Sequence, residues 1–207
     1  MKGMWSKIIN FGVGIIANDY YDINNCQYHN WQHILDCYSY LEKSNIPYSR
    51  ELDWAVLFHD IVYDNQPEKE KRSADFFMQT ITPFDDNGGL LNKQEQQLVY
   101  EIIMSTATHE CSKGHGKDLI NAMIRADLHQ LTNPSLVVSN YSKILNESVK
   151  LYGINETEFA KNNLLFMEKL EETVTKNYNL EYDKFWTDVL SGIRLTQDIS
   201  LAVIKNF

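Results

Sequence analysis

Residues 55–63 read AVLFHDIVY, and the rest of the chain is organised around this stretch. Seven of its nine residues are apolar or aromatic, which is typical of a helix buried on most sides. The remaining two, His59 and Asp60, stand side by side in the middle. An uncompensated carboxylate in apolar surroundings is costly, so a charged partner or a metal ion is expected beside Asp60. A hydrogen-bonded structural pair, or an aspartate that points to solvent, would also satisfy the pattern.

Outward from this stretch, polar capping residues and prolines divide the chain into helices. Ser49 can cap a helix over 50–63, and Asn92 with Glu95 forms a capping box for a helix over 93–107. Further helices are predicted over 4–17, 24–44, 67–80, 117–130, 134–152, 155–175 and 181–204, with Pro67 at the first position of its helix. Strand signals are weak. The sequence therefore predicts an all-α bundle of about eight or nine helices.

The 207 residues suffice for one domain with a full core and are few for two. No internal repeat, low-complexity segment or Gly/Ser-rich linker interrupts the chain. We therefore expect a single domain over residues 1–207. The apolar stripes after residue 134 fit packing on that domain, and they fit the seam of a homodimer equally well.

The composition argues against several classes of protein. A hydrophobic fraction of 43% disfavours disorder, and a formal net charge of -9 disfavours binding to a nucleic-acid polymer or an anionic membrane. No stretch approaches the ~18 apolar residues of a membrane span, and the glycine-interrupted run over 11–17 does not resemble a signal peptide. The three cysteines are odd in number and contain no CxxC pair, which fits a reducing cytoplasm.

A second polar cluster, YHNWQH over 28–33, contains His29 and His33 one helical turn apart. On the predicted helix these imidazoles share a face with Cys26 and Cys37. A zinc site made of all four residues is excluded, because the two cysteines would lie roughly 16 Å apart along the helix axis. The cysteines fit small buried residues better. Helix packing alone would also explain the histidine pair.

Residues 124–129 read IRADLH and place Asp127 in a helix with apolar periodicity. A surface aspartate is the usual case there, so Asp127 alone indicates little. In combination, His33, the doublet His59-Asp60 and Asp127 resemble the motif of the HD superfamily of metal-dependent phosphohydrolases. The combination of a histidine, a His-Asp doublet and a distant aspartate is much more specific than its parts.

The resemblance extends to the contexts YHNWQHI, LFHDIVYDN, KRSA and RADLHQL, and it covers about residues 25–130. It points to small bacterial HD proteins with a YHxxxH motif and an HDIVYD-like motif. It implies a helical bundle of the HD-domain type, with an HD core over about 25–130 and C-terminal helices over 134–205 that complete the bundle.

By this resemblance, His33, His59, Asp60 and Asp127 are ligands of one divalent ion. Two imidazoles and two carboxylates suit Mn, Fe, Co, Ni or Zn, with Mg as a further candidate, and they leave positions for water and a phosphate oxygen. Neighbouring side chains such as His59 and Asp60 diverge by about 100° on a helix, so a shared ion demands a particular local geometry.

Three carboxylates are candidates for catalysis. Better-studied nucleotidases of this superfamily often carry a glutamate three residues after the doublet aspartate, where this chain has Tyr63. Asp60 itself, Asp64 beside Tyr63, and Glu70 are therefore the expected residues to orient water or to transfer a proton. Asp64 could instead serve only the turn, and Glu70 could belong to a solvated helix start.

Three basic residues are candidates for contacting a phosphate: His29, Arg72 and His109. His109 and His115 lie in the loop before the Asp127 helix. Some proteins of the HD superfamily hold a second metal ion with extra histidines from this region, so the resemblance leaves a binuclear site open. The alternative for both loop histidines is a solvent-exposed position, and the alternative for Arg72 is a solvated helix surface.

The resemblance thus implies a metal-dependent phosphohydrolase that hydrolyses a small, nucleotide-like phosphomonoester or phosphodiester with metal-activated water. Because Tyr63 replaces the glutamate, the motif also fits a non-catalytic module that holds a metal and binds a nucleotide for regulation. A third interpretation is a helical interaction protein in which His59 and Asp60 form only a buried hydrogen bond.

Overall fold

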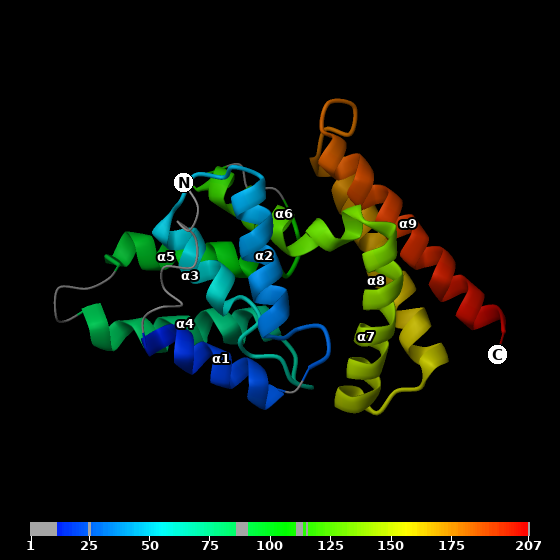
Figure 1. The fold of residues 1–207 in the computed structure, drawn as a ribbon, viewed down its shortest axis with the longest axis horizontal. Helices are drawn as coiled ribbons and strands as arrows, with labels where there is room; N and C mark the ends of the chain where they lie inside the picture. Colours follow the sequence, from blue (N-terminus) through cyan, green and yellow to red (C-terminus); the bar gives the residue numbers. More distant parts are fainter. Residues whose placement is uncertain (1–11, 25, 86–90, 111–113, 115, 207) are drawn as a thin grey trace. The chain divides into compact units, whose positions relative to one another are not determined.

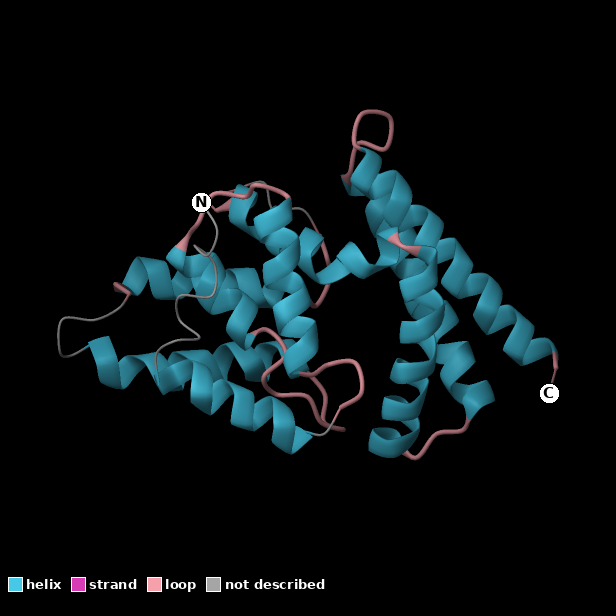
Figure 2. Ribbon diagram, viewed as in Figure 1, coloured by secondary structure: helices cyan, strands magenta, loops and turns pink. Residues whose placement is uncertain are grey.

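The computed structural model describes residues 12–24, 26–85, 91–110, 114 and 116–206 of the chain. Within these ranges it contains nine α-helices, one short 3-10 helix and no strand (Figure 1, Figure 2). The predicted all-α bundle is therefore confirmed. No helix in the described part of the chain is both long and apolar enough to cross a membrane. The helices are α1 (Gly12–Asn24), α2 (Trp31–Lys43), α3 (Arg50–Phe58), α4 (Lys69–Asp85), α5 (Lys93–Ser105), α6 (Lys117–Leu128), η2 (His129–Thr132), α7 (Pro134–Tyr152), α8 (Glu156–Asn177) and α9 (Lys184–Lys205).

Contacts within the chain divide it into two compact units. The first comprises Met1–Ala107 and Cys111–Asp127, and the second comprises Thr108–Glu110 and Leu128–Phe207. The division after Asp127 lies close to the residue at which we expected the HD core to end. The expectation of one domain over the whole chain stays a prediction.

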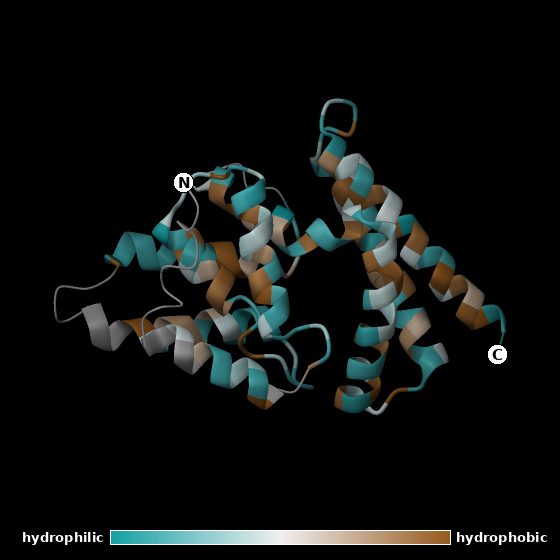
Figure 3. Ribbon diagram, viewed as in Figure 1, coloured by the Kyte–Doolittle hydropathy of each residue, from teal (hydrophilic) through white to brown (hydrophobic). Residues whose placement is uncertain are grey.

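Helix α3 forms the centre of the first unit, where it contacts α1, α2, α4 and α5. Every residue from Leu52 to His59 is buried, and hydrophobic residues dominate this part of the unit in Figure 3. The Trp54 and Phe58 rings lie 5.9 and 5.5 Å from the ring of Phe77 in α4. Packing on all sides, as expected from the sequence, holds the C-terminal end of α3 in a defined position.

Two helix ends differ from the predicted ones at the polar residues of interest. α2 begins at Trp31 rather than at residue 24, because the Asn30 side chain accepts hydrogen bonds from two backbone N–H groups of the first turn. α3 ends at Phe58 rather than at residue 63, and His59 is its C-cap residue. His29 therefore precedes a helix, and the His59-Asp60 doublet follows one.

Two other helices are also shifted along the chain. α1 continues to Asn24, beyond the predicted end at residue 17, because Ala17 and Tyr21 lie one turn apart and are both buried. Residues 4–11 of the predicted helix lie outside the described residues. α4 begins at Lys69, two residues after Pro67, which is therefore not its first residue.

In the second unit, α8 and α9 pack along each other, and α9 also packs on η2. Gly192 lies where α9 meets η2, and a Cβ atom at this position would collide with the carbonyl oxygen of Leu131. A residue without a side chain is therefore required at position 192 for the close approach of α9 to η2. The side chains of Asn140 and Gln130 also form a buried hydrogen bond between α7 and η2.

Candidate metal centre

His33 enters the site from the first turn of α2. Its backbone N–H donates to the Asn30 side chain at 3.3 Å, so the cap that starts the helix also positions this residue. The ring of Tyr28 packs at a centroid distance of 5.1 Å, and the His33 side chain is 1% exposed. Nδ1 of His33 has no hydrogen-bond partner among the described residues. Packing therefore orients this imidazole, with its Nε2 towards His59 and Asp127.

His59 is oriented by its own helix. Its Nδ1 lies 2.9 Å from the carbonyl oxygen of Val56. A carbonyl oxygen only accepts hydrogen bonds, so Nδ1 carries the proton and the lone pair of the neutral ring is on Nε2. This Nε2 atom lies 3.3 Å from Nε2 of His33. The arrangement is the one that a metal-binding histidine needs, with one nitrogen fixed by a carbonyl and the other available.

Asp60 follows directly, and its Oδ2 atom lies 3.2 Å from Nε2 of His59. The end of α3 at Phe58 explains how two neighbouring side chains converge. On a continuous helix they would diverge by about 100°, whereas the turn after α3 brings the imidazole and the carboxylate together.

Asp127 comes from the last turn of α6. Its Oδ1 atom lies 3.2 Å from Nε2 of His33 and 3.8 Å from Nε2 of His59. One ligand atom from each of His33, His59, Asp60 and Asp127 thus lies within 4.8 Å of every other. The structure brings together the four residues that the sequence analysis assigned to a metal ion.

The spacing of these atoms suits a single ion. Metal bonds of about 2.0–2.2 Å separate neighbouring ligand atoms by roughly 3.0–3.6 Å, and the separations from His33 Nε2 are 3.2, 3.3 and 3.7 Å. The two imidazole side chains are at most 1% exposed, whereas those of Asp60 and Asp127 are 13% and 17% exposed. The carboxylates therefore form the side of the cluster that water and a small substrate can reach.

Charges in the cluster compensate each other. Burial lowers the pKa of His59, but the carboxylates of Asp60 and Asp127 outweigh burial and raise this pKa well above 6.5. Burial raises the pKa of Asp60, but His59 and then His29 reverse the effect and hold it well below its usual value. Without a metal ion, a proton on His59 therefore supplies positive charge between the two carboxylates.

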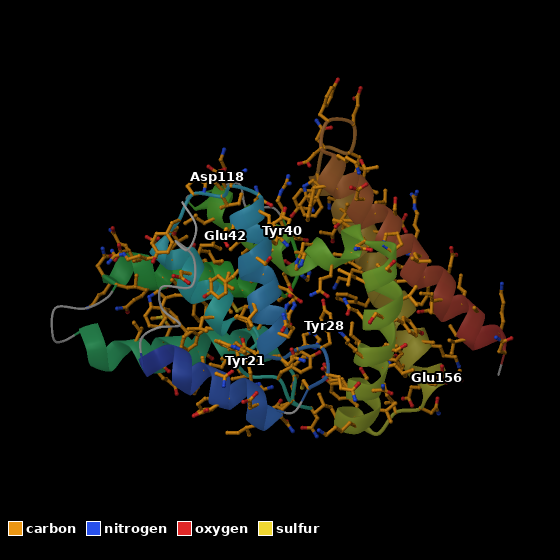
Figure 4. The ribbon with its side chains drawn as sticks, in the orientation of Figure 1. Tyr21, Tyr28, Tyr40, Glu42, Asp118 and Glu156 are labelled. Carbon is orange, nitrogen blue, oxygen red and sulfur yellow. The ribbon has the colours of Figure 1, made fainter. Side chains whose placement is uncertain are left out.

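Tyr21 of α1 supports the doublet and was not foreseen from the sequence. Its hydroxyl donates to the carbonyl oxygen of Leu57 at 3.1 Å, and its ring is fully buried. Burial and the nearby Asp60 charge raise the pKa of this hydroxyl. Tyr21 and Tyr28, both labelled in Figure 4, thus contact the last turn of α3 and the His33 ring, respectively, from outside the ligand set. In the sequence, the one hint of this contact is that Tyr21 follows Ala17 by one helical turn, beyond the predicted end of the first helix.

His29 lies beside the cluster and outside the four-residue group. The sequence predicted that His29 would share a helical face with His33. This prediction is wrong, because α2 begins only at Trp31 and His29 precedes it. Its ring stacks on Tyr63 at a centroid distance of 3.8 Å and lies 6.2 Å from the His33 ring. Nζ of Lys69 lies 3.7 Å from the centroid of the same Tyr63 ring. Lys69 is a basic residue near this position that sequence reasoning missed.

Asp64 and Arg72, assigned to catalysis and to phosphate binding, are paired with each other. Two guanidinium nitrogens of Arg72 lie 2.8 and 2.5 Å from the two Asp64 oxygens. Arg72 also donates to the carbonyl oxygens of Pro67 and Gln66. Its hydrogen bonds lower the pKa of Asp64 to about 2. The pair holds the loop between α3 and α4. The hydrogen bonds between the two side chains would have to break before Asp64 could act in catalysis or Arg72 could bind a phosphate in the expected way.

The other two assigned residues lie outside the four-residue group. Glu70 is in the first turn of α4 and is half-buried. His109 belongs to the second unit, where it is buried and its carbonyl oxygen accepts a hydrogen bond from the Tyr178 hydroxyl at 2.9 Å. The alternative of a solvent-exposed His109 is therefore wrong, because this residue is only 7% exposed. His115 lies outside the described residues.

In comparisons with protein-family models, curated proteins and solved structures, nothing matches this chain. Support for a function therefore comes from the chemistry of the cluster. Its donor set of two neutral imidazoles and two carboxylates fits a divalent ion of the Mn, Fe, Co, Ni or Zn group. Two partly exposed carboxylates also leave room for additional oxygen ligands.

Proposed function

We propose that His33, His59, Asp60 and Asp127 bind a divalent metal ion and that the protein is a metal-dependent phosphohydrolase of the HD superfamily. One observation carries the proposal: four potential ligand atoms, from three segments of the first unit, lie within 4.8 Å of one another. A divalent ion would compensate the charges of the two neighbouring carboxylates more fully than the single proton on His59 does.

The proposed substrate is a small phosphate ester, and a nucleotide is the expected class. A bound divalent ion would supply a Lewis acid and a water of lowered pKa. Asp60 and Asp127 lie on the exposed side, where their outer oxygens can accept hydrogen bonds from the attacking water. His29 and Lys69, which both contact Tyr63, are the nearby basic groups that favour an anionic substrate.

A second candidate is a module that holds the metal and binds a nucleotide without hydrolysing it. The pairing of Asp64 with Arg72 favours this candidate, because it occupies the carboxylate nearest to the position of the missing glutamate. Both candidates require the same metal ligands. They differ in whether a bound nucleotide is converted to product.

The test begins with elemental analysis of the purified chain, followed by chelation and reloading with Mn²⁺, Co²⁺ or Zn²⁺. Phosphate release is then measured over nucleotides, including cyclic and diphosphorylated ones. We expect stoichiometric metal, and we expect Asp60→Ala to abolish turnover while the helical circular-dichroism spectrum is retained. Asp118→Ala is the matched control, because Asp118 (labelled in Figure 4) is an exposed aspartate of α6 outside the cluster.

Full activity of Asp60→Ala would contradict the phosphohydrolase proposal. Stoichiometric metal and tight nucleotide binding without product, after long incubation with each ion, would favour the regulatory module. Failure of the chain to bind any of the three ions would contradict both candidates. The doublet would then be only a hydrogen-bonded pair.

A further inference from the structure

Cys37 lies one turn after His33 on α2 and faces the same two imidazoles. Its Sγ atom lies 3.8 Å from Nε2 of His33, and the side chain is fully buried. Cys37, His33 and His59 form a second group of potential ligand atoms within 4.8 Å of one another. This group differs from the four-residue group by exchanging two carboxylates for one sulfur.

The separations in this second group fit a tetrahedral ion. Bonds of about 2.0–2.1 Å to nitrogen and about 2.3 Å to sulfur place two nitrogens roughly 3.3 Å apart and a sulfur roughly 3.6 Å from each nitrogen. The two Nε2 atoms of His33 and His59 are 3.3 Å apart, and the measured Cys37–His33 separation is 3.8 Å. The ligand atoms of Cys37 and His59 lie within 4.8 Å of each other, so a rotation of the Cys37 side chain would have to bring its sulfur closer to both imidazoles.

The two groups cannot be filled by separate ions. Both use Nε2 of His33 and Nε2 of His59, and a neutral imidazole has one lone pair to donate. The groups also differ in chemical preference, because a thiolate prefers thiophilic ions and carboxylates prefer harder ions. Sharing the imidazoles therefore sets the two kinds of ion in competition.

We propose that Cys37, His33 and His59 form a second, softer metal site for a thiophilic divalent ion such as Zn²⁺, which competes with a harder ion bound through Asp60 and Asp127. This inference rests on the proposed function, since both sites use the same imidazoles. Binding forms a metal–sulfur bond and releases the thiol proton to water, with no change in oxidation state. A thiophilic ion bound at Cys37 would no longer contact the partly exposed carboxylates of Asp60 and Asp127, and it would therefore inhibit turnover.

The Cys37 thiol already has a hydrogen-bond partner. Its Sγ–H donates to the carbonyl oxygen of Ala126 at 3.4 Å. A bound divalent cation would replace this hydrogen bond with a metal–sulfur bond and would stabilise the thiolate directly.

Cobalt provides a direct test on the full chain. We load the metal-free protein with Co²⁺ and record its ligand-field bands together with the near-ultraviolet thiolate-to-cobalt charge-transfer band. We expect both kinds of band in the wild type, and we expect Cys37→Ser to lose only the charge-transfer band. Cys26→Ser is the matched control, since Cys26 is a buried cysteine of the same unit outside both groups, and it should keep this band.

Affinities for two ions separate ligation from packing. We expect Cys37→Ser to weaken Zn²⁺ binding by about tenfold or more, on the scale of losing a group that supports a metal, and to change Mn²⁺ binding much less. Equal losses for both ions, or ligand-field bands without a charge-transfer band in the wild type, would overturn the Cys37 site and leave the His/Asp centre intact. No binding of Co²⁺, Zn²⁺ or Mn²⁺ would overturn the proposed function itself.

Discussion

The Nδ1–H group of His59 donates to the carbonyl oxygen of Val56, 2.9 Å away, and this bond directs Nε2 towards Asp60. Val56 lies in the last turn of α3 and His59 is the C-cap residue of this helix, so the orientation of the imidazole is set by the helix itself. The ring is therefore prepared to bind a cation, and a proton and a metal ion compete for the same nitrogen.

This competition predicts opposite pH dependences. The pKa of His59 is raised above 6.5 in the folded protein. Its contribution to the stability of the metal-free protein is fully present below about pH 6.5 and is lost as the pH rises through the raised pKa. Mn²⁺ binding must displace the proton below that pKa, so affinity for Mn²⁺ rises with pH over the same range.

Thermal unfolding with and without Mn²⁺, at several values between about pH 6 and pH 8, measures both effects. The Mn²⁺-induced increase in Tm should grow with pH. His59→Gln is the comparison variant, since it lacks the titrating ring and should show neither effect. A constant, large Mn²⁺-induced increase across this range in the wild type would contradict the prediction.

Tyr21→Phe should lower stability by about 1–3 kcal/mol, because the buried Leu57 carbonyl oxygen loses its hydrogen-bond donor. The aromatic ring is retained, so packing changes little. Tyr20→Phe is the matched control on the same helix: Tyr20 is 39% exposed, and we expect a change within about 0.5 kcal/mol. Urea unfolding of both variants measures the difference. Equal effects would show that the Tyr21 hydroxyl contributes nothing specific.

Arg72→Lys tests whether the Asp64–Arg72 pair is a structural clamp. The Arg72 and Asp64 side chains are 30% and 45% exposed, so solvent screening should limit the loss of stability to about 1 kcal/mol or less. A lysine cannot form the paired hydrogen bonds, and it cannot also reach the backbone carbonyls. We expect faster amide hydrogen exchange at residues 64–66 and unchanged metal content. Loss of the metal would place Arg72 nearer to the centre than its contacts indicate.

Gly192→Ala should destabilise the protein by about 1–3 kcal/mol or more, because the added methyl group meets the backbone of Leu131 rather than a movable side chain. Ser191→Ala, at the exposed neighbouring position of α9, is the control and should stay within about 0.5 kcal/mol. Chemical denaturation gives both values. A neutral Gly192→Ala variant would mean that α9 and η2 can move apart at no cost.

Much of the fold could be predicted because several helices begin or end at explicit signals. Asn92 with Glu95 forms the expected capping box, and the helix that starts at Pro134 was predicted with both of its ends correct. The start of α2 was missed because Asn30 lies inside a stretch of helical periodicity, and only the structure shows that its side chain caps the following turn.

The convergence of His33, His59, Asp60 and Asp127 could be predicted from a motif, because the residue types themselves carry the chemistry. The contacts around them could not. Tyr21 reaches the end of α3 through tertiary packing. Cys37 shares a helical face with His33, as the sequence predicted, but its approach to His59 depends on how α2 packs against the end of α3. Periodicity places a side chain on a face of its own helix and does not tell which atom it meets on another.

The separation of His33 from Asp127 has a further consequence for folding. These two residues are 94 positions apart in the chain, yet their side chains are 3.2 Å apart. An ion bound by both would act as a reversible cross-link that closes a very long loop, and closing such a loop is entropically unfavourable for an unfolded chain. Contacts this distant in sequence form late and slow the folding of a helical domain. The centre should therefore be completed only after the helices are assembled, and chelators added during refolding should affect the final step more than the first collapse.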